Sequence, residues 1–170
     1  MYPSSIIHQK TYLMRKRNYK ILIADTSCLI VVLKIKAAYI LHELFEEVYI
    51  TDDIHKELGF AKPQWLHLLN PNDTKLQEAL ELEIDKGKAS ALTLFYDLDN
   101  AVIALDDLKA RRVAKKLNIP FTGTFGLLLK AKEMGIIKQV KPFLQKIKAT
   151  NFRYSEALYQ TVLKQAGENP

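Results

Sequence analysis

Two short apolar runs in this chain each end on an acidic residue and then lead into a helix. The first run spans residues 21–24 and is followed by Asp25, and the second spans residues 101–105 and is followed by Asp106. Short apolar runs of this kind are typical of strands buried in a parallel sheet. Because such strands alternate with helical segments through short links, the sequence predicts an α/β fold with a mainly parallel sheet.

The acids that follow these two strands are expected to share a site. Ligands of an open parallel sheet collect just outside the carboxyl ends of its strands. Two carboxylates about 4 Å apart repel by about 1 kcal/mol in water and about 4 kcal/mol at a surface-like dielectric, and a bound divalent cation relieves this. Asp25 and Asp106 could instead be helix N-caps, a role that favours aspartate. Thr26 and Ser27 could likewise steady a carboxylate or cap the helix.

Composition narrows the class of protein. The 170 residues fit one domain with a sizeable core, and no stretch approaches the roughly 20 apolar residues of a membrane span. The single cysteine, Cys28, excludes an intramolecular disulfide and sits among apolar neighbours, as a core residue would. The chain starts without the apolar segment of a secretory signal, so we expect a cytoplasmic protein without membrane contact. A net charge of +6 is compatible with a polyanionic partner.

The chain divides into three parts. Residues 1–19 read as a basic leader that could be mobile, residues 20–164 as a single domain, and residues 165–170 as a C-terminal tail. Within the domain, strands are expected at 20–25, 48–51, 101–105 and 119–122, and an irregular edge strand within 63–72. Helices are expected at 27–35, 37–46, 74–84, 87–98, 107–117, up to 134 after the last strand, 140–148 and 154–164.

A basic row lies on the helix expected at 107–117. Its outward positions follow directly on the acids at 106 and 107, and they carry Lys109, Arg111, Arg112, Lys115 and Lys116. Charged rows on helices are usually solvated faces. Beside an acidic pocket, this row could instead hold the phosphates of a nucleic acid.

Several segments resemble the PIN domains, a family of small metal-dependent nucleases. Residues 24–30 resemble the opening strand of that family, and residues 54–58, which contain Glu57, resemble its second acidic motif. Residues 105–114 match the later acidic strand end and its helix. Residues 123–137 resemble a subgroup related to VapC-type toxins. The resemblance extends from about residue 20 to residue 163.

The resemblance implies a doubly wound sheet of four or five parallel strands that binds Mg²⁺ or Mn²⁺. Carried over by position, the catalytic acids would be Asp25, Glu57 and Asp106, and Asp107 would join Asp25 and Asp106 as a metal ligand. In that family the metal activates water for attack on an RNA phosphodiester, which suits a hard cation held by few carboxylates and several waters.

The implied function is therefore a metal-dependent endoribonuclease, and the subgroup adds the role of a toxin paired with a small antitoxin protein. The chain could form a homodimer. Arg112 and Lys116, with Lys109 and Arg111, would contact the RNA.

One position departs from the subgroup. The helix before the second acidic strand usually opens with Gly-Glu, and here the pair is Gly87-Lys88. A cation in the first turn opposes the helix dipole, so the local sequence gives no folding reason for Lys88. Its ammonium could reach the remaining acids and take the place of the metal. Lys88 therefore leads to a second hypothesis for the function. In it, the chain is a catalytically weakened PIN-like domain that binds nucleic acid or a partner protein without cutting nucleic acid.

Overall fold

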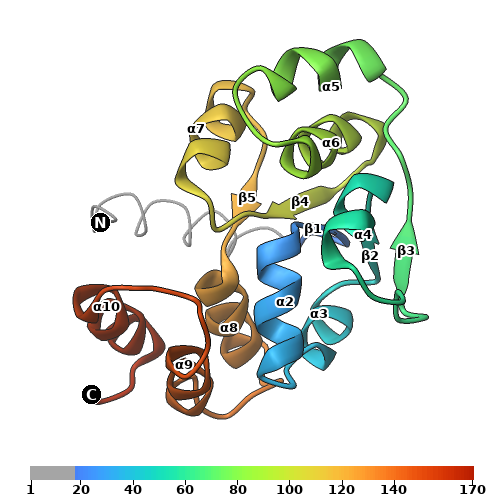
Figure 1. The fold of residues 1–170 in the computed structure, drawn as a ribbon. Helices are drawn as coiled ribbons and strands as arrows, with labels where there is room; N and C mark the ends of the chain where they lie inside the picture. Colours follow the sequence, from blue (N-terminus) through green and yellow to red (C-terminus); the bar gives the residue numbers. More distant parts are fainter. Residues whose placement is uncertain (1–17) are drawn as a thin grey trace.

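The computed structural model describes residues 18–170 and builds them around a parallel sheet (Figure 1). The expected leader lies outside the described residues except for its last two positions. The five strands are β1 (Ile21–Ala24), β2 (Glu47–Ile50), β3 (Leu66–Leu68), β4 (Ala101–Ala104) and β5 (Phe121–Thr122). They lie in the order β3-β2-β1-β4-β5, and all neighbouring pairs are parallel.

Helices cover both faces of this sheet, so the expected doubly wound α/β fold is confirmed. α5, α6 and α7 lie on one side, α2, α3 and α8 lie on the other, and α9 and α10 lie beyond α8 (Figure 1). α4 packs against both α2 and α6. The helices are α2 (Thr26–Lys34), α3 (Tyr39–Leu44), α4 (Asp52–Leu58), α5 (Thr74–Glu81), α6 (Lys86–Leu94), α7 (Leu108–Lys116), α8 (Thr124–Glu133), α9 (Lys141–Lys148) and α10 (Glu156–Ala166), and a 3-10 turn (Phe95–Asp97) follows α6.

The strand order changes direction between β1 and β4. From β1 the chain runs outward through β2 and β3, and it then returns to place β4 on the other side of β1. The two central strands are aligned so that Ala24 pairs with Ala104. Asp25, which follows Ala24, donates its backbone N–H to the Ala104 carbonyl at 3.3 Å. The crevice at such a switch point is where open α/β sheets bind their ligands.

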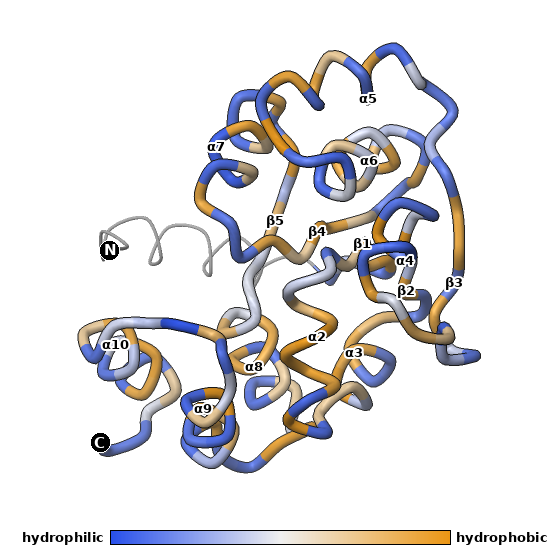
Figure 2. The backbone as a smooth tube through the Cα atoms, in the orientation of Figure 1, coloured by the Kyte–Doolittle hydropathy of each residue, from blue (hydrophilic) through white to orange (hydrophobic). Residues whose placement is uncertain are grey.

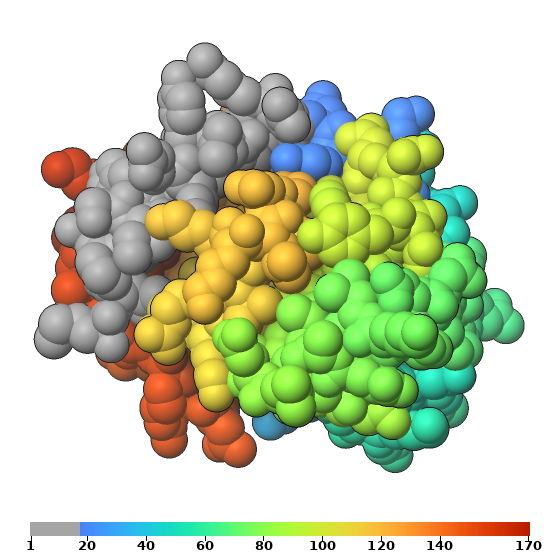
Figure 3. Space-filling model, turned by 90° about the horizontal axis from the view of Figure 1, so that it is seen from above, coloured from blue at the N-terminus to red at the C-terminus, as the bar shows by residue number. Residues whose placement is uncertain are grey.

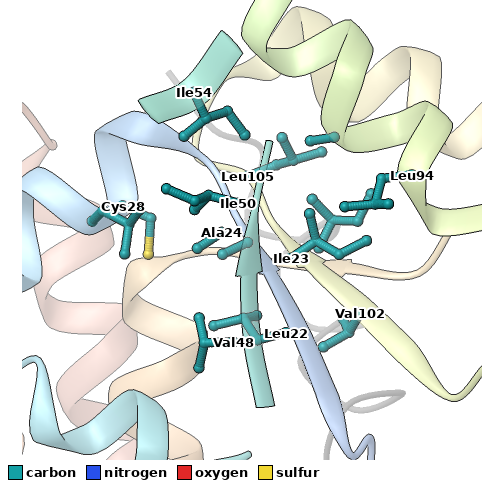
Figure 4. Packing of buried hydrophobic residues seen from close by; sticks show 14 of the residues in the cluster. Leu22, Ile23, Ala24, Cys28, Val48, Ile50, Ile54, Leu94, Val102 and Leu105 are labelled. Carbon is teal, nitrogen blue, oxygen red and sulfur yellow. The ribbon is translucent and has the colours of Figure 1, made fainter. Parts of the chain in front are cut away.

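The apolar runs form the centre of the core. β4 is buried along its whole length, and Leu22 and Ile23 of β1 are fully buried. Figure 4 shows these strands packing against residues of the flanking helices, and Cys28 lies among them as a buried core residue. A second apolar cluster lies between α2, α3, α8, α9 and α10. The hydropathy colouring in Figure 2 follows this division, with the central strands apolar and the outer turns of α5 and α7 largely polar.

Some element ends differ from the sequence expectations. α4, which was not among the expected helices, is capped by Thr51, whose hydroxyl accepts a hydrogen bond from Ile54 N at 3.2 Å. α10 continues to Ala166, and Glu168 beyond it is hydrogen-bonded to the start of α9. Among residues 18–170, no helix is both long and apolar enough to cross a membrane.

Candidate functional site

Asp25 lies at the switch point and is completely buried. It holds the N-cap position of α2 but makes no side-chain cap hydrogen bond. Its Oδ2 accepts from Ser27 Oγ at 3.1 Å, and its Oδ1 is buried without a hydrogen-bond partner among the described residues. Burial raises the pKa of Asp25 to about 6, although the Lys88 ammonium opposes this shift. The side chain therefore offers an acceptor that the fold itself leaves unused, which a capping role does not explain.

Glu57 reaches the same region from α4. Its Oε2 accepts a hydrogen bond from Thr26 Oγ1 at 2.6 Å, which joins α4 to the first residue of α2. Gly87 at the start of α6 leaves room for this carboxylate, because a Cβ at position 87 would lie 2.8 Å from Glu57 Cδ. The position of Glu57 thus depends on the Thr26 hydroxyl of α2 and on the absence of a side chain at Gly87 of α6.

Asp106 is hydrogen-bonded to Thr124, the first residue of α8, which lies 18 residues further along the chain. Its Oδ1 accepts from Thr124 N at 2.9 Å, and its Oδ2 accepts from Thr124 Oγ1 at 2.6 Å. The guanidinium of Arg111 lies 3.6 Å from Oδ1, and Arg111 Nε donates to the Leu105 carbonyl at 2.6 Å. Sequence reasoning missed Thr124, and the only signal for it was a hydroxyl directly after the last strand and its glycine.

The neighbouring acid, Asp107, serves as a helix cap. Its Oδ1 accepts from Ala110 N at 2.7 Å at the start of α7. Asp107 therefore caps α7, whereas Asp25 makes no capping hydrogen bond and Asp106 accepts from Thr124 instead. This hydrogen bond uses one carboxylate oxygen of Asp107, which the resemblance implies is a metal ligand.

Asp25 and Asp106 follow neighbouring strands that are aligned with each other. Asp25 N donates to the Ala104 carbonyl at 3.3 Å, and Ala104 lies two residues before Asp106. Burial raises the pKa of the Cys28 thiol, and the charges of Asp106 and Asp25 raise it further. The backbone therefore delivers the acids that follow β1 and β4 to the same edge of the sheet, at the switch point.

Lys88 lies close to Asp25. Its Nζ is 3.9 Å from Asp25 Oδ2 and 2.5 Å from Asp85 Oδ2, and its side chain is 16% exposed. Asp85 is the N-cap of α6 and also accepts from Lys88 N at 3.1 Å. Burial by itself would lower the pKa of Lys88, but the carboxylates of Asp25 and Asp85 outweigh it and raise this pKa. Asp85, as the N-cap of α6, thus supplies a local partner for the Lys88 ammonium.

An open hollow of about 230 Å³ lies outside this pair. Asp85, Lys88, Asp107 and Lys109 line it, together with residues 81–84 that follow α5. Figure 3, which shows the molecule from above, has the surfaces of α5 in green and α7 in yellow side by side. A salt bridge between Lys116 and Glu83, at 3.9 Å, connects the two sides.

The basic row on α7 divides into two sets. Lys109, Arg112, Lys115 and Lys116 are exposed. Arg111 turns inward to Asp106 and Leu105, and its guanidinium lies 5.5 Å from the centre of the Phe121 ring. The structure therefore places Arg111 among the residues that hold Asp106, while the other members of the row face solvent.

The donor chemistry at Asp25 fits a divalent cation. Within residues 18–170, no three His, Cys, Asp or Glu side chains are grouped so that they could hold a metal ion. Mg²⁺, however, commonly binds through one or two carboxylates and keeps several waters. Asp25 Oδ1 is a hard oxygen donor that has no hydrogen-bond partner among residues 18–170. Glu57 and Asp106 instead form separate hydrogen-bonded pairs with Thr26 and Thr124.

Comparison with known proteins agrees with this geometry. A family model described as a PIN domain matches residues 21–168, from the first residue of β1 to just beyond α10. No curated protein matched the chain. PIN domains are generally nucleases. The chain belongs to the PIN domain family.

Proposed function

We propose that this chain is a metal-dependent endoribonuclease with its hydrolytic centre at Asp25, Glu57 and Asp106. The observation that carries the proposal is the buried Asp25 carboxylate at the switch point, with one oxygen that has no hydrogen-bond partner among the described residues. Buried polar groups are normally paired, so an unused carboxylate oxygen at the ligand-binding edge of a sheet is typical of a functional site.

Each acid has its own part in the proposed site. Mg²⁺ or Mn²⁺, when bound, would supply an activated water and polarise the phosphate. Asp25 would hold that cation through Oδ1, with Asp106 and Asp107 nearby. Thr26 keeps the Glu57 carboxylate at the edge of the site. Thr124 and Arg111 fix the orientation of Asp106, which removes the entropy cost of ordering it when RNA binds.

The exposed cations of α7 support RNA as the substrate. Lys109 lines the hollow beside Lys88, and Arg112 and Lys116 continue along the same helix. Phosphate contacts of this kind bind and position a nucleic acid without reading its sequence. A cytoplasmic location is part of this proposal. The toxin role and the small antitoxin partner enter this proposal through the resemblance of residues 123–137 to a subgroup related to VapC-type toxins. A homodimer is also part of the proposal.

A second candidate is a PIN domain that binds RNA without cutting it. The observation in its favour is the Lys88 ammonium, 3.9 Å from Asp25 Oδ2. A cation at that distance neutralises the carboxylate that would otherwise attract a metal ion.

RNA binding and cleavage, measured separately, distinguish the two candidates. The purified chain is incubated with labelled single-stranded RNA and Mn²⁺, with and without a chelator. The variants are Asp25→Asn and, as a matched control, the exposed Asp99→Asn. An endoribonuclease cuts only with Mn²⁺ and loses cutting in Asp25→Asn but not in Asp99→Asn. Binding without cutting supports the second candidate, and the absence of both contradicts the RNA proposal.

A further inference from the structure

The Lys88 ammonium is fixed by the helix that carries it. Asp85 caps α6 through the Lys88 backbone N–H at 3.1 Å, and its second oxygen accepts from Lys88 Nζ at 2.5 Å. The same residue therefore starts the helix and holds the cation. With 16% of its side chain exposed, Lys88 stays beside Asp25 instead of extending into solvent.

The charges around this ammonium are those that would otherwise attract a metal ion. Asp25 lies on one side and Asp85 on the other, and the charge of Asp107 also acts on Lys88. Carboxylates gathered in this way repel one another, and one positive charge among them relieves the repulsion. Lys88 supplies that charge from within the chain.

We propose that Lys88 is a built-in cation of this site, which competes with divalent ions for Asp25 and provides positive charge beside the hollow when no metal is bound. This inference rests on the proposed function, because it takes Asp25 as the acid that would hold the metal. The competition is intramolecular, because Lys88 and Asp25 belong to the same folded chain and lie 3.9 Å apart. A divalent ion must therefore displace a partner that is always present.

Metal binding in the absence of RNA tests the first half of the proposal. Mn²⁺ is titrated by calorimetry into the full chain as wild type, Lys88→Gln and Lys88→Glu. Lys86→Gln and Lys86→Glu are the matched controls, because Lys86 belongs to the same helix but pairs with Asp53 at 3.5 Å and is 62% exposed. We expect Lys88→Gln to bind Mn²⁺ at least tenfold more tightly than wild type, about 1.4 kcal/mol, and the Lys86 variants to stay within about twofold.

RNA binding in a chelator tests the second half. Wild type should bind single-stranded RNA nearly equally with Mn²⁺ and with EDTA, because Lys88 already supplies the charge. Lys88→Gln should bind more weakly in EDTA and recover when Mn²⁺ is added. Circular dichroism confirms that each variant is folded. If Lys88→Glu does not fold, the comparison of Lys88→Gln with wild type tests the proposal.

Two outcomes overturn the inference. In one, the Lys88 variants bind Mn²⁺ no more tightly than the Lys86 variants, and in the other no protein in the series binds Mn²⁺. A tenfold gain in Mn²⁺ affinity in proteins that neither bind nor cut RNA would contradict the proposed function instead, and would leave Lys88 as the competitor for the metal.

Discussion

Thr124 donates hydrogen bonds to both carboxylate oxygens of Asp106, through its backbone N–H at 2.9 Å and its hydroxyl at 2.6 Å. Asp106 follows β4 and Thr124 begins α8, so this pair fixes the strand-end acid to the helix after the next strand. Gly123 permits the approach, because a Cβ there would lie 2.7 Å from Asp106 Oδ1. The orientation of Asp106 is therefore set by Thr124 of α8 together with Arg111 of α7.

Replacing Thr124 with valine should destabilise the protein by about 1.5–3 kcal/mol. The substitution keeps the size of the side chain but removes a buried hydrogen bond to a charged group. Urea denaturation followed by circular dichroism measures the change in the free energy of unfolding. Thr161→Val is the control, because the Thr161 hydroxyl donates an exposed hydrogen bond to the Ala157 carbonyl within α10, and it should change stability by less than about 0.5 kcal/mol. Equal losses in the two variants would contradict the assigned role of Thr124.

Replacing Gly87 with alanine should have opposite effects in two backgrounds. In wild type the added methyl group collides with the Glu57 carboxylate, and overpacking of this kind costs about 1–3 kcal/mol. In Glu57→Ala the collision is absent, and alanine within a helix should gain up to about 1 kcal/mol over glycine. A double-mutant cycle of unfolding free energies measures the coupling. A cost of the same size in both backgrounds would mean that Gly87 is needed for a reason other than room for Glu57.

Asp25→Asn should stabilise the metal-free protein at neutral pH. The folded pKa of Asp25, about 6, lies above the ordinary value of about 3.9, so ionisation favours the unfolded chain. Wild-type stability should fall as the pH rises from about 4 to 6, and the variant should avoid this loss. We expect a gain of about 1–3 kcal/mol above pH 6, because Lys88 keeps Asp85 as its partner. Thermal melts of both proteins between pH 4 and pH 8 check this, and parallel curves would contradict it.

Glu168→Gln should show the opposite pH dependence. Burial by itself would raise the pKa of Glu168, but its bonds to Lys132 and to the backbone N–H groups of Val140 and Lys141 outweigh burial and lower the pKa. Its contribution to stability is complete above the ordinary glutamate pKa of about 4.3 and is lost as the pH falls through the folded pKa. The variant should lose about 1–3 kcal/mol at pH 7. This difference should shrink in acid, as melting curves at pH 7 and pH 3 would show.

Alanine at Arg112 and Lys116 should weaken RNA binding if α7 contacts phosphates. Each lost contact with a single strand should reduce the slope of log affinity against log salt by about 0.7. Fluorescence anisotropy over a range of salt concentrations measures both quantities. The control is the double alanine variant of Lys34 and Lys164, which are exposed lysines on α2 and α10. If the slope of log affinity against log salt is unchanged in the α7 variant, the basic row on α7 is only a solvated face.

The order of strands and helices could be predicted from local sequence patterns. The apolar runs at 21–24 and 101–105 form β1 and β4, which ends at Ala104, and Ala110, Val113 and Ala114 form the buried side of α7 as their i, i+3, i+4 spacing predicts. Apolar periodicity determines these features because the free energy gained by burying an apolar side chain depends mainly on the area that it removes from water. It depends little on which distant residues cover that side chain. The same local information was enough to place two acids at one edge of the sheet.

The partners of those acids were decided only by the tertiary structure. Asp106 and Thr124 are 18 residues apart, and Thr26 and Glu57 are 31 residues apart. The sequence likewise did not show that Arg111 turns inward while Arg112 faces solvent, or that Asp85 holds Lys88 beside Asp25. Hydrogen bonds and ion pairs depend on a few tenths of an ångström and on angles between elements, so they are defined only when the packed helices set those distances. The sequence by itself determined which chemical groups reach the site, and the packing of α4, α6 and α8 decided which of them remain free to bind a ligand.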